Sequence, residues 1–391
     1  MVVNSDGVDS VALVGRASHL QRMDKVLADA RSGSAGAVIV WGEPGIGKTR
    51  LVSEWCERAV AAGSEVLAGR GSESEQEVPF GMVVQALDER FAALDSQVVA
   101  KVGPNRMAEL AAVLPSLSRG GGQSARRLEV ERFEFHRAVR FAFDQLARRK
   151  PIVLALDDVH WADPASVELI GHLLRHSVPG LVLVLAYRPR QAPRLLVDAV
   201  LQAARESSVC ELELAPLTLA EAAEALGARP DSALAGALHF ESGGNPFYLE
   251  QLARSSGKLL PIPRAGGAAG KEAGISVALR MTITNELSGL VSDTLRVLQA
   301  GAVAGDPFDL DLVTAIVESE QHRVLRSLDE LVAVDLVRPT KTPGRFRFRY
   351  PIVRRVVYDE AMPGWRYSAH KQAAEALGRR GASVGTRALV E

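Results

Sequence analysis

A run of glycines that ends on a lysine and a threonine is the first stretch of this sequence that could do chemistry. Residues 42–49 read GEPGIGKT and match the pattern G-x-x-x-x-G-K-[ST] at every fixed position. Glycines let backbone N–H groups turn inward around an anion, because no Cβ blocks the required dihedral angles. An apolar, strand-like run at 37–41 precedes the loop, and a helical pattern follows from Lys48. The loop is therefore predicted to hold the phosphates of a nucleotide, ATP or ADP.

Each residue of this loop is a candidate for contact with the nucleotide. The helix after the loop would point its positive N-terminal end at the phosphates. The Lys48 ammonium would approach the β- and γ-phosphates, and the Thr49 hydroxyl would coordinate Mg²⁺. The predicted contacts are Gly42, Glu43, Pro44, Gly45, Ile46, Gly47, Lys48, Thr49 and Arg50.

Two acidic residues follow an apolar run of the kind that is buried on both faces of a parallel sheet. Asp157 and Asp158 end the run PIVLALDD. A carboxylate at the carboxyl end of a neighbouring parallel strand is where a P-loop protein holds magnesium, so Asp157 is the candidate ligand of Mg²⁺. Asp158 would orient the attacking water. The alternative is a polar strand end that caps the next helix, a role that suits Asp163 before Pro164 better.

Arg188 follows the third apolar run, LVLVLAY, at the same predicted edge of the sheet as the loop. Its guanidinium could contact the γ-phosphate there and so distinguish a triphosphate from a diphosphate. The alternative is a surface arginine that leads into the turn at Pro189. Lys48, Asp158 and Arg188 are thus the candidate catalytic residues.

The elements that must position these residues alternate between strand and helix from residue 37 to about 215, which indicates an α/β domain with a parallel sheet. Helical patterns follow, interrupted by a segment rich in glycine, alanine and proline that is typical of a linker. Three short helical patterns and two strand-like pieces, LVRPT and RFRFRY, then have the outline of a winged helix. The predicted parts are a P-loop α/β domain over 1–215, a helical lid over 216–258, a linker over 259–275, a winged helix over 276–363 and a helical segment over 364–391.

The helical pattern over 128–149 has an apolar face that contains Phe135, Val139, Ala142 and Leu146. Arginines on its other face, Arg132 among them, alternate with acidic residues. A stripe that binds nucleic acid is one interpretation, but a solvated face with salt bridges is the expectation.

Composition excludes several classes of protein. The 391 residues are 47% hydrophobic and 24% charged, and the formal net charge of −1 gives no global attraction to nucleic acid or to an anionic membrane. Two cysteines make neither a disulfide framework nor a metal site. We find no leader with a basic and an apolar part, and no apolar run of the ~20 residues that a membrane span requires. A cytoplasmic setting without a membrane partner is expected.

In chain order, the motifs resemble those of the STAND class of P-loop NTPases. They are most similar to the ATP-binding, AAA-like half of large LuxR-type (MalT-like) bacterial transcriptional regulators. The motifs run from about residue 13 to 377 and read LVGR, GEPGIGKTRL, LALDDVHWADPAS, LAYRP, LAPLTLAEA, GGNPFYLEQL and FRYPIVRRVVYDEAM. The resemblance implies a switch that is closed with ADP and open or self-associated with ATP, and that responds to a small-molecule or protein inducer. It also implies that DNA is contacted only through a C-terminal domain that lies beyond Glu391, so the chain is expected to be a fragment or a truncated member.

The resemblance implies roles for residues outside the loop as well. The positions that it places against the adenine or ribose are Val14, Gly15, Arg16 and, from the helical lid, Pro246. The sequence departs from the family at Ala17, where Glu is common, and at Tyr350, where a histidine that reaches the ADP β-phosphate is common. Tyr350 either replaces that histidine as a hydroxyl donor or leaves the resting state less tightly locked.

Asp157 and Asp158 favour a protein that senses ATP over an enzyme that hydrolyses it rapidly. Fast ATPases commonly have Glu after the aspartate that binds Mg²⁺, and Asp158 is one methylene shorter. An error of ~1 Å in the position of a catalytic group can cost ~100-fold in rate, so slow hydrolysis is predicted. Two alternatives remain open. One is a dedicated P-loop ATPase or kinase, and the other is an origin-recognition-like ATPase that binds DNA through RFRFRYPIVRR in its winged helix.

Overall fold

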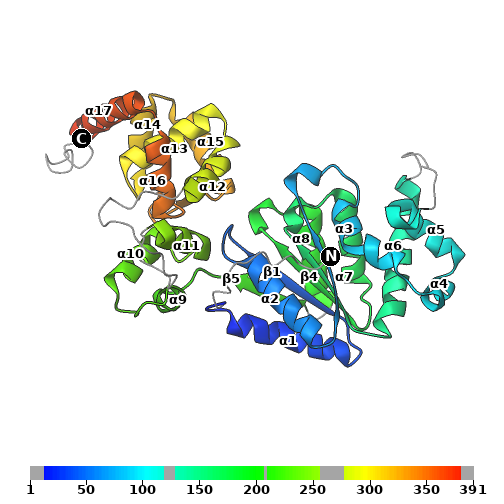
Figure 1. The fold of residues 1–391 in the computed structure, drawn as a ribbon. Helices are drawn as coiled ribbons and strands as arrows, with labels where there is room; N and C mark the ends of the chain where they lie inside the picture. Colours follow the sequence, from blue (N-terminus) through cyan, green and yellow to red (C-terminus); the bar gives the residue numbers. More distant parts are fainter. Residues whose placement is uncertain (1–12, 119–127, 207–208, 256–276, 380–391) are drawn as a thin grey trace. The chain divides into compact units, whose positions relative to one another are not determined.

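The chain folds into two compact units, which the computed structural model describes over residues 13–118, 128–206, 209–255 and 277–379 (Figure 1). One unit is Leu13–Ala215, and the other contains the described residues from Pro216 onward. The predicted linker at 259–275 lies outside the described residues.

The first unit alternates helices and strands. In chain order its helices and strands are α1 (Ala17–Arg31), β1 (Gly36–Gly42), α2 (Lys48–Ala61), β2 (Glu65–Arg70), α3 (Gly81–Ala92), α4 (Ser96–Val102), α5 (Pro104–Val113), α6 (Leu128–Ala147), β3 (Ile152–Asp157), α7 (Pro164–Arg175), β4 (Leu181–Tyr187), α8 (Arg194–Glu206) and β5 (Val209–Leu214).

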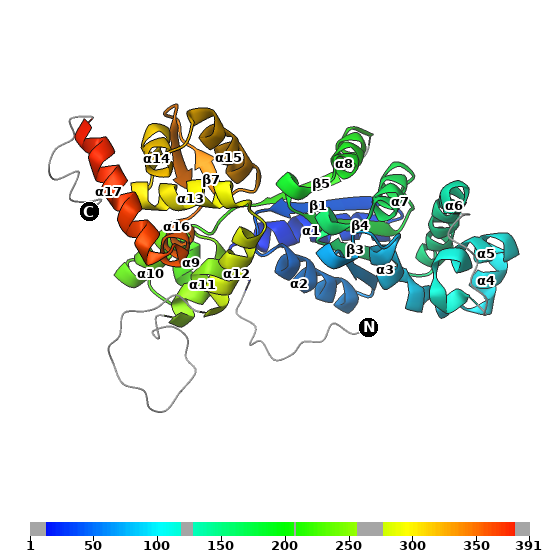
Figure 2. The ribbon, with the colours of Figure 1, turned by 90° about the horizontal axis from the view of Figure 1, so that it is seen from above.

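These strands form one parallel sheet in the order β2-β3-β4-β1-β5. Helices cover both faces: α2 lies on one side of the sheet, and α7 and α8 lie on the other (Figure 2). Core packing places α1 with α2, and α3 and α6 with α7 and α8. Along β1 the side chains alternate between the two cores: Val38 and Val40 pack on the side of α1 and α2, and Ile39 packs on the opposite side. Burial on both faces explains why β3 and β4 are continuous apolar runs.

The strand order corrects one expectation. The acidic strand β3 does not pair with the loop strand β1, because β4 lies between them. The prediction that a neighbouring strand of β1 supplies Asp157 and Asp158 is therefore wrong. A strand that is buried on both faces is apolar whichever strand lies beside it. The hydrophobic pattern of the sequence therefore does not predict which strands pair.

The second unit is mainly helical. Its helices and strands are α9 (Leu219–Ala225), α10 (Ala233–Ser242), α11 (Pro246–Ser255), α12 (Val277–Ser288), α13 (Ser292–Ala304), β6 (Phe308–Asp309), α14 (Leu310–Val317), α15 (Gln321–Ala333), β7 (Val337–Pro339), β8 (Arg345–Phe348), α16 (Pro351–Glu360) and α17 (Pro363–Arg379).

A small antiparallel sheet in the order β6-β8-β7 joins the helices of this unit. One apolar core, which includes Leu217, Leu298 and Val353, extends from α9 to α17. The predicted fold class is confirmed: a parallel α/β core is followed by a helical region and by three helices with a β-ribbon. Within the described part of the chain, no helix is long and apolar enough to span a bilayer.

Candidate functional site

The glycine loop joins β1 to α2 and leaves the start of α2 open to a ligand. Gly47, the N-cap of α2, has a φ of 99°, and Gly45 has a φ of 74°, values that favour glycine. The first N–H groups of a helix have no intrahelical acceptor, and no side chain caps those of α2. Ile46 is fully buried and anchors the loop. The loop therefore has the open N–H groups and the positive helix end that bind phosphate.

The Lys48 ammonium lies inside this loop. Its Nζ donates hydrogen bonds to the carbonyl oxygens of Gly42 (3.0 Å) and Glu43 (2.9 Å). Burial, and next the positive charge of Arg188, lowers the pKa of Lys48 to about 8, although nearby carboxylates oppose the shift. Lys48 is thus a desolvated cation beside a second cation, an arrangement that an anionic ligand would stabilise.

Asp157 ends β3 with one carboxylate oxygen, Oδ2, that accepts no hydrogen bond among the described residues and lies 4.0 Å from Arg70 Nε. Its Oδ1 accepts a hydrogen bond from the backbone N–H of Asp158 (2.9 Å), whereas its buried Oδ2 has no hydrogen-bond partner among the described residues. Burial, and next the charge of Asp158, raises the pKa of Asp157, and the nearby Thr49 hydroxyl opposes this rise. A buried carboxylate oxygen that accepts no hydrogen bond, near a hydroxyl, is a donor set that fits Mg²⁺.

Asp158 adopts a left-handed conformation with a φ of 50° and forms an ion pair with Arg70. The Nη2 and Nε atoms of Arg70 lie 2.8 and 3.0 Å from Asp158 Oδ2. Arg70 ends β2, the strand next to β3 in the sheet. Sequence reasoning missed this arginine, whose only signal is its position at the carboxyl end of a strand.

His160 and Arg188 complete the cluster around Lys48. His160, on the 3₁₀ turn Val159–Trp161, is 1% exposed, and neither ring nitrogen has a hydrogen-bond partner in the described ranges. Burial, and next Arg188, lowers the pKa of His160 to about 4, and Lys48 adds to this shift, so the ring is neutral near pH 7. Arg188 follows β4, which pairs with β1, and its Nη1 donates to Gln191 Oε1 (3.3 Å). His160 lies in the motif that the sequence singled out, but no role was predicted for it.

Arg16 lies beside the loop, as one of the residues predicted to touch the base or ribose. Its Nη2 donates to the carbonyl oxygen of Ala215 (2.7 Å) and, at 3.4 Å, to that of Ile46. Val14 and Gly15 precede it and are partly buried. Arg16 therefore supports the loop, and contact of these residues with a nucleotide stays a prediction.

Pro246 and Tyr350 belong to the second unit. Pro246 begins α11, Tyr350 is the N-cap of α16, and the residues next to Pro246 contact Tyr350. Asn245, next to Pro246, donates from Nδ2 to the Tyr350 hydroxyl (3.4 Å). The Tyr350 ring packs against Gly243, where an added Cβ would come within 2.2 Å of the ring. Their roles toward a nucleotide stay predictions.

Sequence comparison finds a family model that is similar to the first part of the chain. Residues 12–185 match the family model described as an AAA ATPase domain. An uncharacterized protein of Rhizobium meliloti (strain 1021) is 26% identical over 97% of this chain. This chain spans 38% of the length of that relative.

Structural comparison supports the fold. The ORC2 protein of Aeropyrum pernix, solved as ADPNP–ADP complexes, is similar with a TM-score of 0.50 and 14% identity, over 93% of this chain and 95% of that one. A Signal Transduction ATPase with Numerous Domains (STAND) that has a tetratricopeptide repeat sensor, from Pyrococcus horikoshii, aligns with a TM-score of 0.39 and 13% identity. That alignment covers 95% of this chain and 46% of that protein. The family match and the parallel sheet thus make the first unit similar to P-loop ATPase domains of the AAA type.

Proposed function

We propose that the chain is an ATP/ADP-binding switch of a signal-transduction regulator, similar to the STAND-type regulators of the LuxR group. The observation that carries this proposal is the cluster at the start of α2. There an uncapped helix end, the desolvated Lys48 and a buried oxygen of Asp157 that accepts no hydrogen bond among the described residues lie close together. The ADPNP–ADP complexes of the ORC2 protein with a similar fold support a nucleotide as the ligand.

Different residues of the cluster would bind the phosphates and the magnesium ion of Mg-ATP. Backbone N–H groups of the loop and Lys48 would hold the β- and γ-phosphates, and Thr49 and Asp157 would hold Mg²⁺. Mg²⁺ would neutralise part of the charge on these phosphates. Arg188, which is close enough to affect the pKa of Lys48, would contact the γ-phosphate.

Slow hydrolysis follows from the partner of Asp158. A carboxylate that accepts two hydrogen bonds from Arg70 is held in one orientation. It can therefore orient a water molecule, but it is not free to move toward that water. Slow turnover suits a switch, because the ATP-bound state must last long enough to be sensed.

A switch must also bind one nucleotide state more tightly than the other. Moving a population from 1:99 to 99:1 requires about 10⁴-fold preferential binding, or roughly 5.5 kcal/mol. One extra phosphate would gain contacts from Lys48, Mg²⁺ and Arg188, each of which is a charge-assisted interaction. Three such contacts at ~1.5–3 kcal/mol each are enough to supply that difference.

Nucleotide extracted from the freshly purified protein and separated by chromatography tests the proposal. Stoichiometric ADP, together with turnover well below one per second, is expected. Lys48→Ala should remove the bound nucleotide, and the matched control Lys150→Ala, an exposed lysine, should retain it. Equal nucleotide content in the two variants would disprove the phosphate-loop assignment.

A second candidate function is DNA binding by the β-ribbon, as in an origin-recognition-like ATPase. Arg345 and Arg347 of β8 are exposed and alternate with Phe346 and Phe348, which pack toward the core. The exposed arginines could contact phosphates. Duplex DNA retarded by the wild type but not by Arg345→Gln/Arg347→Gln, with a steep salt dependence, would favour this function. Equal retardation by both proteins would exclude the ribbon as the contact.

A further inference from the structure

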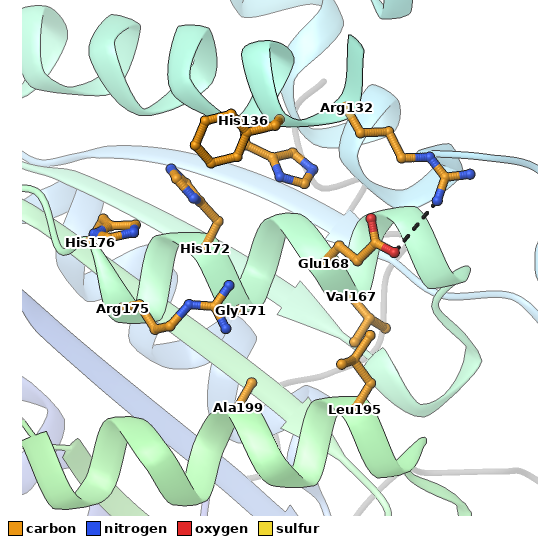
Figure 3. Close-up of a pocket in the computed structure, with 11 residues that line it drawn as sticks. Arg132, His136, Val167, Glu168, Gly171, His172, Arg175, His176, Leu195 and Ala199 are labelled. Atoms are coloured by element: carbon orange, nitrogen blue, oxygen red, sulfur yellow. Dashed lines mark hydrogen bonds and ion pairs between the residues drawn. The ribbon is translucent and has the colours of Figure 1, made fainter. Parts of the chain in front are cut away.

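A second hollow lies away from the glycine loop, between α6, α7 and α8. It has a volume of about 510 Å³, within the range of small-molecule sites. Figure 3 shows His136 of α6 and His172 of α7 in the space between these two helices, with Leu195 and Ala199 of α8 on the other side. Gly171 and Ala199, where α7 and α8 come close together, also line the hollow.

Several buried polar atoms around this hollow have no partner. His136 and His172 are 6% and 5% exposed, and the Nε2 atom of each lacks a hydrogen-bond partner among the described residues. The same is true of Arg132 Nε. Leaving a buried polar group unpaired is unfavourable, so three such atoms at one hollow indicate a polar ligand.

The charge of the lining is positive. Arg132 and Arg175 contribute two guanidinium groups, and Glu168, which lies 3.5 Å from Arg132 Nη1, contributes the one carboxylate of the lining. Arg175 has no ion pair in the described part of the chain. Burial, and next the positive charge of Arg132, lowers the pKa of His136 to about 4. Burial, and next the neighbouring His176, lowers the pKa of His172 to about 4. Both imidazoles are therefore neutral near pH 7, each with one donor and one acceptor.

Two other properties limit the ligand. Phe133 and Leu195, at the edge of the hollow, are 59% and 49% exposed although they are large and apolar. Apolar side chains of this size stabilise a ligand that carries an apolar part. No group of three histidine, cysteine or acidic residues within the described ranges is placed to hold a metal ion, so the histidines are not explained as metal ligands.

We propose that this hollow binds a small organic anion with an apolar body, such as an aromatic carboxylate, as a site separate from the glycine loop. The carboxylate would accept hydrogen bonds from Arg175, Arg132 and the imidazoles, and the apolar body would pack on Phe133 and Leu195. Arg132 was expected on a solvated face with salt bridges, and the proposed site gives this residue a different role.

The position of the hollow links it to the nucleotide site. Helix α7 begins at Pro164, shortly after Asp158, and α8 begins at Arg194, shortly after Arg188. A ligand that bridges these helices acts on the elements that follow two candidate catalytic residues. If the chain is the proposed switch, an anion bound here would act as its effector. The binding of the anion itself does not depend on that function.

Titration with 2-naphthoate as the probe, followed by calorimetry on the full chain, tests the proposal. The neutral isostere 2-naphthamide should bind at least about tenfold more weakly, because it lacks the charge that pairs with Arg175. Arg175→Gln should weaken naphthoate binding by a similar factor. The matched control Arg148→Gln removes an exposed arginine of the α6 region that pairs with Asp144, and it should not change the affinity.

Three results would overturn the proposal. They are no binding of 2-naphthoate, equal binding of the acid and the amide, and equal affinity in Arg175→Gln and Arg148→Gln. Arg175 is exposed, so its substitution leaves the fold intact, and a thermal melt verifies this. The effect of Mg-ATP on the naphthoate affinity should level off as Mg-ATP is raised, because ligands at two coupled sites change each other's affinity by a fixed factor. A loss of affinity that keeps growing in proportion to the Mg-ATP concentration would instead place the probe at the glycine loop and refute a separate site.

Discussion

The affinity for Mg-ADP should fall as the pH rises from 7 to 9, because only the protonated form of Lys48 attracts the phosphates. Its pKa is lowered to about 8 in the folded protein, first by burial and next by Arg188. With that value, about nine tenths of the protein carries the ammonium at pH 7 and about one tenth at pH 9. The dissociation constant should therefore increase about tenfold over this range. Nearby phosphates favour the charged form, so the complex keeps its proton while the free protein loses it.

Calorimetry can measure both the affinity and the proton. Titrations in buffers of different ionisation enthalpy should show an uptake of about half a proton per nucleotide at pH 8 and close to none at pH 6.5. Lys48→Arg serves as the control, because a guanidinium stays charged throughout this range. That variant should bind more weakly, with an affinity independent of pH.

A constant affinity of the wild type between pH 7 and 9, without proton uptake, would refute the reasoning. Either the pKa of Lys48 is not lowered, or its ammonium does not contact the ligand. An equal pH dependence in the wild type and in Lys48→Arg would attribute the effect to another group.

Three further predictions follow from the site and from the second unit. Asp158→Asn should keep ATP affinity within about twofold and lower phosphate release at least about tenfold; an equal loss in Arg70→Gln would show that the ion pair, and not the carboxylate, matters. Arg188→Ala should weaken ATP binding about tenfold more than ADP binding in parallel titrations, and an equal loss for both nucleotides would make Arg188 a general contact. Gly243→Ala should lower the free energy of unfolding by about 2 kcal/mol or more in urea, because φ is 59° and the new Cβ meets the Tyr350 ring. A change below about 0.5 kcal/mol would contradict that packing.

Much of the first unit could be predicted because its core strands are covered on both faces. Every residue of β4 is buried, so its apolar run is continuous and easily recognised. The edge strand β5 is different, because Glu211 and Glu213 are exposed and interrupt the pattern. The N-cap of α7 was also predictable, since Asp163 accepts a hydrogen bond from the Ser166 N–H (3.0 Å) and Pro164 follows it.

The parts of the site that sequence reasoning missed depend on contacts between elements. Arg70 reaches Asp158 only because β2 pairs with β3. The hydrophobicity of the strands does not predict their order in the sheet. His136 and His172 come from different helices, and each alone is typical of an ordinary core or surface histidine. Helical periodicity correctly predicts the buried face with Phe135 and Val139, but not the hollow beside it.

The guanidinium of Arg16 has a mechanical consequence. It connects Ile46 in the glycine loop to Ala215, the last residue of the first unit before the chain enters the second. If a bound phosphate displaces Ile46, either the 3.4 Å hydrogen bond between Arg16 and the Ile46 carbonyl breaks, or Arg16 and Ala215 move with the loop. Under the proposed switch, Arg16 would therefore pass a shift of the loop on to Ala215, the residue at which the first unit ends.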